Sequence, residues 1–340
     1  MSIIAELEEI VEIFEVIIES ITLLLMPLAI ANAIGLKKEV PPAPEEIWYE
    51  ITIDNSANSN DLTDYQVLLT ITGDAQFFSD CSNDDKVIEI YDEDKATLIP
   101  FYVEEWDAIN KNARIWIKVP LIPANSIKKV YLKVNPDRTE SLSNPDNVFD
   151  FYDDFSDNDV NGWTPTISTD VSEHDDILDI TLTANIGGEG GVYNNLSVLN
   201  DGIEIVAKMK LVNDLSAYTG LGVFFRYQDI DNFFVFQWTE TPEYRLRKKV
   251  AGTFTDFVNL TDQGAPQVDV WYIIHVKVYS DGTIKAYVEG KAEISATDTT
   301  FTSGYIGIHI RNTSGQKGYV DWIYVRKITE PEPTVTYNKL

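Results

Sequence analysis

The stretch GLGVFFRYQDIDNFFVFQW, residues 220–238, decides the fold class. Its apolar residues stand next to one another, as in Phe224-Phe225 and in the run from Phe233 to Phe236. Short continuous apolar runs of this kind are typical of strands that are covered on both faces. The stretch therefore predicts a large sandwich of two curved, well-covered β-sheets.

Similar patterns continue on both sides of this stretch, in GIEIVAKMKLV, WYIIHVKVYSDGTIKAYVEGKAEI, GYIGIHIRN and GYVDWIYVRKI. Within the second of these, SDGT at 280–283 carries the Asp-Gly pair that is typical of a tight hairpin turn. Together these runs predict one β-sandwich over residues 147–329.

Four segments of this region resemble the concanavalin-A-like lectin and glucanase (LamG-like) superfamily. They are DDFSDNDVNGW at 153–163, FFRYQDIDNFFVFQW at 224–238, TDTTFTSGYIGI at 297–308 and YVDWIYVRK at 319–327. The resemblance implies a jelly roll. Members of that superfamily bind carbohydrates, bind proteins, serve as spacers or hydrolyse glycans, so the resemblance alone does not choose a function.

A smaller β-sandwich is predicted for residues 47–140. Apolar and polar residues alternate there with the period of two that a half-buried strand requires. The runs are IWYEITI (47–53), YQVLLTI (65–71), KVIEIYD (86–92), ARIWIKV (113–119) and KKVYLKV (128–134). Polar turns such as NSANSND separate them.

Residues 46–140 resemble a family of β-sandwich modules of unknown function that occur in surface proteins of archaea and bacteria, often beside lectin-like domains. The resemblance implies display at a surface and brings no catalytic residues with it. Trp48, Trp106 and Trp116 are expected to pack in the core or between sheets. The predicted fold is thus mainly all-β, with two tandem β-sandwiches preceded by one long N-terminal α-helix.

That helix is predicted for residues 1–38, where apolar residues recur every seven positions and form a wide stripe. The stripe positions are Ile4, Leu7, Val11, Phe14, Ile18, Ile21, Leu25 and Leu28. Wide stripes favour bundles of three or more helices, so the helix is predicted to assemble copies of the chain. Residues 20–36 carry no charge and are a candidate for membrane contact, although Pro27 interrupts them. The acidic start of the chain does not fit a secretory signal, which needs a basic n-region.

Two segments of the chain have other patterns. A Pro-rich linker is predicted for residues 39–46, and an extended tail for residues 330–340. The tail is expected to stay loose or to add a strand to a neighbouring subunit.

Charge and cysteine content exclude several classes of protein. The chain has 55 acidic and 26 basic residues and a formal charge of −29, so it would repel nucleic acid. Its single cysteine, Cys81, excludes an intrachain disulfide.

The sequence predicts no enzyme. Glycan hydrolysis in the resembled superfamily usually uses two carboxylates on one strand, one as nucleophile and one as acid. Glu240 and Glu243 form the closest pair, but they flank Pro242 and are expected in a loop. His174, His275 and His309 are far apart, and no metalloprotease, phosphate-loop or serine-hydrolase pattern is present.

Three kinds of binding site are candidates. Trp238, Tyr244 and Arg245 could form an aromatic platform for a glycan, with core packing as the alternative. Asp153, Asp154, Asp157 and Asp159 crowd one loop and could hold Ca²⁺, although no cofactor is required. N-glycosylation sequons begin at Asn195, Asn259 and Asn312.

These observations predict a non-enzymatic, surface-displayed structural or adhesion protein. Its N-terminal helix would assemble it into a homo-oligomer, either a pilus-like filament or a virion spike, with the β-sandwiches exposed outward. The alternative is a lectin-like module that binds a carbohydrate or a cell-surface receptor and is anchored to a membrane. A glycan hydrolase is the third hypothesis. An extracellular or virion surface is the expected location.

Overall fold

The computed structural model describes residues 46–340 except 185–189, 195–198, 201, 215–218, 240–242 and 312. The predicted N-terminal helix with its eight stripe positions, the membrane-contact candidate at 20–36 and most of the Pro-rich linker lie outside the described residues. None of the helices in the described part is long and apolar enough to cross a membrane.

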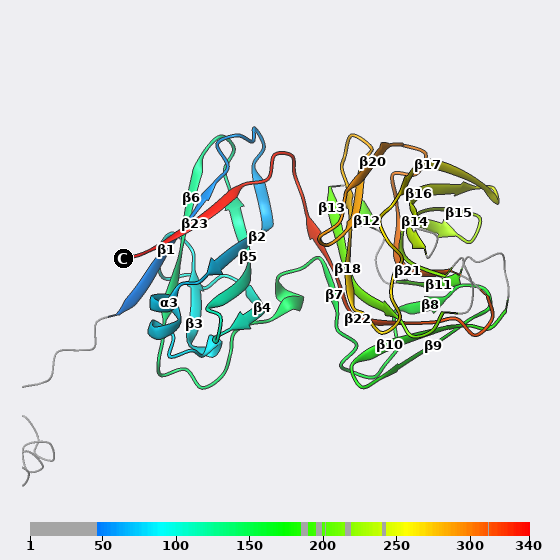
Figure 1. The fold of residues 1–340 in the computed structure, drawn as a ribbon. Coiled ribbons are helices and arrows are strands. Elements are labelled where there is room, and N and C mark those ends of the chain that lie inside the picture. Colours follow the sequence, from blue (N-terminus) through cyan, green and yellow to red (C-terminus); the bar gives the residue numbers. More distant parts are fainter. Residues whose placement is uncertain are drawn as a thin grey trace, which may run out of the picture. The chain divides into compact units, whose positions relative to one another are not determined.

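The first β-sandwich consists of two sheets with strand orders β23-β1-β6-β3 and β2-β5-β4 (Figure 1). Its elements are β1 (Ile47–Asp54), β2 (Leu62–Thr72), helix α3 (Ala75–Asp80), β3 (Ile88–Tyr91), β4 (Phe101–Asp107), β5 (Asn112–Ile122), β6 (Ile127–Val134) and β23 (Thr334–Lys339). Each of the five predicted runs contains a strand, although Lys86 and Val87 of the third belong to a 3-10 helix (Asp85–Val87), and β4, β23 and α3 were not predicted.

Side-chain alternation builds the core of this sandwich. In β1, Tyr49, Ile51 and Ile53 are buried, while the residues between them are partly exposed. Helix α3 adds Phe77 and Phe78, and Asp74 caps it by accepting the Gln76 and Phe77 amides. Cys81 follows α3 and is fully buried, and burial raises the pKa of its thiol to about 12. The thiol is therefore protonated and inert at neutral pH.

The chain end returns to the first sandwich. Strand β23 pairs antiparallel with β1, from Asp54↔Thr334 to Tyr49↔Lys339, and Figure 1 shows it in red beside the blue strand β1. The sequence predicted an extended tail that is loose or pairs with another subunit. The structure pairs it within its own chain, so the second sandwich is inserted between β6 and β23 of the first.

The second sandwich has two larger sheets. Their orders are β20-β19-β18-β13-β22-β10-β9, with β7 beside β22, and β17-β16-β15-β14-β21-β11-β8, with β12 beside β21. The strands are β7 (Phe151–Asp153), β8 (Trp163–Pro165), β9 (Thr169–His174), β10 (Ile177–Leu182), β11 (Gly190–Asn194), β12 (Leu199–Asn200), β13 (Ile203–Leu211), β14 (Gly220–Asp229), β15 (Asn232–Thr239), β16 (Glu243–Val250), β17 (Thr253–Thr261), β18 (Tyr272–Val278), β19 (Thr283–Val288), β20 (Ile294–Thr297), β21 (Ser303–Arg311) and β22 (Lys317–Lys327).

The stretch 220–238 forms β14 and β15, and both of its faces are covered as predicted. Phe225, Phe234 and Phe236 belong to the core between the two sheets. Phe224 and Phe233 lie in a separate buried cluster. The Asp-Gly turn at 281–282 joins β18 to β19, with Gly282 at a positive φ of 86°, as the predicted hairpin requires.

An apolar cluster joins the two sandwiches. Trp116 of β5 packs with Phe149, Val206 and Tyr324, and the Phe149 and Tyr324 rings stack with centroids 4.2 Å apart. Gln66 of β2 is fully buried beside this cluster. Its side-chain amide donates to the Val148 carbonyl at 2.8 Å and accepts from the Lys327 amide at 2.9 Å. These contacts give the two sandwiches a shared, packed interface.

A buried ion network lies on the same side of the second sandwich as this apolar cluster. Arg326 donates to Glu204 at 2.6 Å through Nε and to Glu332 at 2.9 Å through both Nη atoms. Burial alone would raise the pKa of Glu204, but the charges of Arg326 and His275 override it and lower the pKa to about 2. Glu204 is therefore a carboxylate at neutral pH.

Candidate functional site: a cleft between the sandwiches

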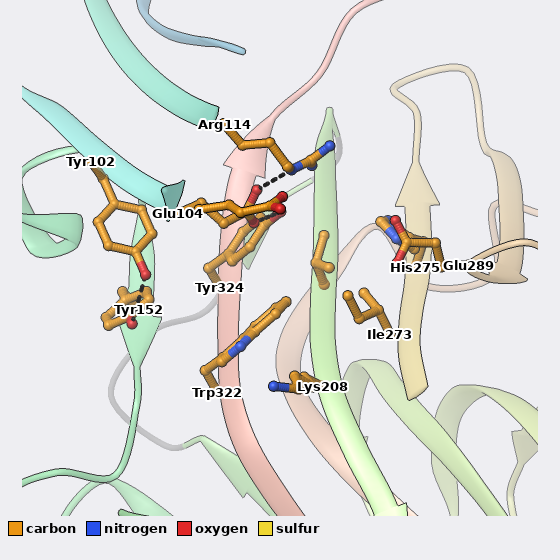
Figure 2. Close-up of a pocket in the computed structure, with 12 residues that line it drawn as sticks. Tyr102, Glu104, Arg114, Tyr152, Lys208, Ile273, His275, Glu289, Trp322 and Tyr324 are labelled. Atoms are coloured by element: carbon orange, nitrogen blue, oxygen red, sulfur yellow. Dashed lines mark hydrogen bonds and ion pairs between the residues drawn. The ribbon is translucent and has the colours of Figure 1, made fainter. Parts of the chain in front are cut away.

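A cleft of about 380 Å³ opens where the two sandwiches meet (Figure 2). This volume lies within the range of small-molecule sites, toward its lower end. Strands from both sandwiches line it, with Tyr102, Glu104, Glu105, Arg114, Tyr152, Val206, Lys208, Ile273, His275, Glu289, Trp322 and Tyr324.

The second sandwich supplies an aromatic wall. Trp322 and Tyr324 are two residues apart on β22 and so share the face opposite the core residues Ile323 and Val325. Their rings are stacked, with centroids 5.5 Å apart and planes 14° apart. Tyr324 is buried against Phe149, whereas Trp322 stays partly exposed in the cleft. Figure 2 shows the two rings side by side along the strand.

Strand register extends this wall into two rows across the sheet. One row runs from Tyr324 through Val206 to His275. The other runs from Trp322 through Lys208 to Ile273, and the Glu289 amide bonds to the Ile273 carbonyl at its end. The wall is therefore an apolar and aromatic strip with charged groups along its length.

The first sandwich supplies a polar wall. The Glu104 carboxylate accepts from Arg114 Nε at 2.7 Å and from the Tyr324 hydroxyl at 3.4 Å. The Tyr102 hydroxyl of this wall lies 3.4 Å from the hydroxyl of Tyr152, which belongs to β7 of the second sandwich, and burial raises the pKa of both phenols. Both phenols therefore remain protonated and can donate or accept hydrogen bonds.

The predicted glycan platform lies elsewhere. Trp238 and Tyr244 are fully buried in the core between the sheets, and Trp238 donates to the Gly264 carbonyl at 2.6 Å. The structure favours core packing, the alternative interpretation, because such rings cannot face a sugar. Arg245 lies beside them on β16 and is half-buried. Glu240 lies outside the described residues, and Glu243 begins β16.

Sequence reasoning missed Trp322 and Tyr324. The signal was present in YVDWIYVRK, where two aromatic residues at positions i and i+2 must share a face. That face cannot be distinguished from a core face by sequence, because Ile323 and Val325 make the opposite face apolar as well.

The predicted calcium residues lie in and after β7, where local hydrogen bonds use their carboxylates. Asp153 accepts from the Trp163 indole at 2.7 Å and from the Phe155 amide at 2.9 Å. Asp154, Asp157 and Asp159 each accept the backbone amide two residues further on. Among the described residues there is no group of three or more His, Cys, Asp or Glu side chains that could hold a metal ion. Calcium binding stays a prediction.

Glu173 of β9 lies beside this loop with both carboxylate oxygens buried. Burial and the charges of Asp153 and Asp157 raise its pKa to about 7. A raised carboxyl pKa means that the folded state loses stability as pH rises from the unfolded pKa toward 7 and above it. We therefore expect Glu173→Gln to raise the melting temperature by about 1–3 °C at pH 8, and to change it little at pH 5.

Thermal unfolding with chelator present would measure this effect, with the exposed Glu93→Gln as a matched control. A lower melting temperature for Glu173→Gln at pH 8 would contradict the expectation, because it would mean that the charged form is stabilised.

Of the three sequons, Asn259 is exposed on β17, while Asn195 and Asn312 lie outside the described residues. An exposed side chain on a strand is accessible to a glycan, and glycosylation stays a prediction.

Comparison with known proteins supports part of the predicted resemblance. Residues 84–166 match a family described as "Domain of unknown function (DUF2341)". This match covers much of the first sandwich, for which a family of unknown function was predicted, and reaches the start of the second. No curated protein matches the chain.

Several solved structures are similar to about half of the chain. One is the carbohydrate-binding module CBM66 from Bacillus subtilis, at 14% identity and a TM-score of 0.41, covering 49% of this chain and 96% of that one. Another is a Bacillus subtilis protein of unknown function with a galectin-like fold, at 14% identity and a TM-score of 0.40, covering 53% of this chain and 96% of that one. A third is an endo-β-1,3-glucanase from Pyrococcus furiosus, at 12% identity and a TM-score of 0.40, covering 54% of this chain and 95% of that one. Their descriptions include both binding and hydrolysis, so they do not choose a function for this chain.

Proposed function

We propose that this chain is a non-enzymatic, lectin-like protein that binds a saccharide in the cleft between its two sandwiches. The observation that carries the proposal is the partly exposed Trp322 ring, stacked on Tyr324 and bordered by Lys208, Glu104 and Arg114. Saccharide sites combine an aromatic surface, which packs against the apolar face of the sugar ring, with a few polar groups that bond its hydroxyls.

The carboxylate that contacts the aromatic wall, Glu104, is better suited to binding than to hydrolysis. A glycosidase needs a carboxylic acid and a second carboxylate that are free to act on the scissile bond. In this cleft, Arg114 occupies one Glu104 oxygen and the Tyr324 hydroxyl occupies the other. Glu104 therefore serves as an acceptor that holds Arg114 and Tyr324 in position.

We place the protein at an extracellular or virion surface, displayed by its N-terminal residues. The acidic charge of the chain suits such display, because it keeps the exposed surface solvated. The contacts of Gln66 and Phe149 hold the two sandwiches together around the cleft. Assembly through the N-terminal stripe remains part of this proposal.

The first test is a glycan array followed by titration calorimetry on the full chain. We expect at least one neutral or charged oligosaccharide to bind, and Trp322→Ala to weaken its binding by about tenfold or more. Trp48→Ala is the matched control, because Trp48 lies on β1, outside the cleft lining.

Two results would contradict the proposal. One is the absence of binding by any saccharide on the array. The other is an equal loss of affinity in the Trp48 and Trp322 variants, which would place the site elsewhere or show a general effect on the fold.

A further inference from the structure

The charges of the cleft indicate which saccharides it would take. Resting on the proposed glycan binding, we infer that this cleft selects saccharides with free amino groups over acetylated and anionic ones.

Each basic side chain in the cleft already has an anionic partner. Arg114 pairs with Glu104 at 2.7 Å, and Lys208 pairs with Asp321 at 2.6 Å. The third basic side chain, His275, bonds through Nδ1 to Glu204 at 3.0 Å. These basic side chains are therefore poorly placed to attract a sulfate or a uronic acid.

Two carboxylates of the cleft are different. Neither Glu105 nor Glu289 has an ion pair or a side-chain hydrogen bond to any described residue, and both are exposed. Burial lowers the pKa of Arg114, but the charge of Glu104 and, to a smaller extent, that of Glu289 raise it, and the Arg114 guanidinium is bonded to Glu104. The cleft therefore presents uncompensated negative charge.

The two carboxylates come from different walls. Glu105 belongs to β4 of the first sandwich, and Glu289 directly follows β19 of the second, at the end of the row that starts at Trp322. An oligosaccharide that packs one ring on Trp322 and extends along this row would carry its other rings toward Glu289. An ammonium group that reaches one of these carboxylates would form an ion-paired hydrogen bond, whereas an acetamide N–H donates without a positive charge and a sulfate has no donor.

The chain's overall charge of −29 acts in the same direction. It favours the approach of cationic ligands and opposes anionic ones at low salt. Because Glu105 and Glu289 are exposed, each contact would change the affinity by only about two- to fivefold, and salt would weaken it.

The test compares glucosamine tetrasaccharide, its fully N-acetylated form and a heparin tetrasaccharide, each titrated into the full chain at 50 and 500 mM salt. We expect the free-amine form to bind about tenfold more tightly than the acetylated form at low salt, and heparin not to bind. In the double variant Glu105→Gln/Glu289→Gln, this preference should fall below about twofold, while affinity for the acetylated form stays unchanged. Glu93→Gln, which changes an exposed glutamate outside the cleft, should keep the preference.

The outcomes separate this inference from the proposed function. Equal or tighter binding of the acetylated form would overturn the inference and leave glycan binding intact. A lost preference in Glu93→Gln would also overturn it, because the effect would then come from overall charge. Tetralysine is titrated in the same way. If tetralysine binds and no saccharide does, both proposals are overturned and the cleft is a binding site for cationic peptides. Absence of binding by every saccharide would contradict the proposed function itself.

Discussion

Replacing Arg326 by methionine is expected to lower the free energy of unfolding by about 3–5 kcal/mol. Arg326 and Glu204 are 6% and 3% exposed, so water cannot solvate the Glu204 carboxylate, which keeps only the His275 bond at 3.0 Å and a 4.0 Å ion pair with Lys277. Methionine keeps much of the side-chain volume, so the effect reports on charge rather than on a cavity. Glu332, which Arg326 also holds, lies between the second sandwich and β23, so the loss should reach the interface as well.

Urea unfolding would measure this loss. Lys129→Met is the control, because Lys129 pairs with Glu50 at 2.8 Å but is 45% exposed, and its loss should cost less than about 1 kcal/mol. The double variant Arg326→Met/Glu204→Gln should recover a large part of the stability, because it leaves no buried charge. If Arg326→Met lowers the free energy of unfolding no more than Lys129→Met does, water reaches Glu204 and the ion network is not shielded from solvent.

The strands could be predicted because their signal is local. Whether Ile51 and Ile53 face the core follows from a period of two within one run of residues. In the same way, adjacent phenylalanines such as Phe224 and Phe225 require a sheet covered on both faces. Neither inference needs knowledge of which strands are neighbours.

The interface between the sandwiches could not be predicted, because its contacts join residues far apart in the chain. Gln66 bonds to Lys327, 261 positions away, and nothing in LTDYQVLLTIT distinguishes this glutamine from a solvent-facing one. The cleft exists only because of that interface, so its lining was also invisible in the sequence.

The two aromatic pairs of the second sandwich illustrate the same limit. Trp238 and Tyr244 stand near a predicted loop in the sequence, with Arg245 beside Tyr244, which made them candidates for a binding surface. Trp322 and Tyr324 are also flanked by charges, at Asp321 and Arg326. Only the sheet faces, which depend on strand pairing, bury the first pair in the core and direct the Trp322 ring toward the cleft.

Deleting residues 334–340, which contain β23, is expected to lower the free energy of unfolding of the first sandwich by about 3–5 kcal/mol. Val335 and Tyr337 pack against the core, and the Tyr337 hydroxyl donates to Asp74 at 2.8 Å. Six residue pairs join β23 to β1, so the deletion would also leave the backbone groups of β1 unpaired at a sheet edge. Unpaired edges promote association, so the truncated chain should form larger assemblies than the full chain as its concentration rises.

Urea unfolding and light scattering would measure both effects, and a synthetic peptide of residues 333–340 offers the sharpest control. Added in excess, it should restore the lost stability through mass action, whereas a scrambled peptide should not. Unchanged stability after deletion would mean that the chain end is a loose tail in solution. If the full chain behaved as an oligomer that the deletion turned into a monomer, β23 would instead be shared between copies, because pairing within one chain predicts the opposite change.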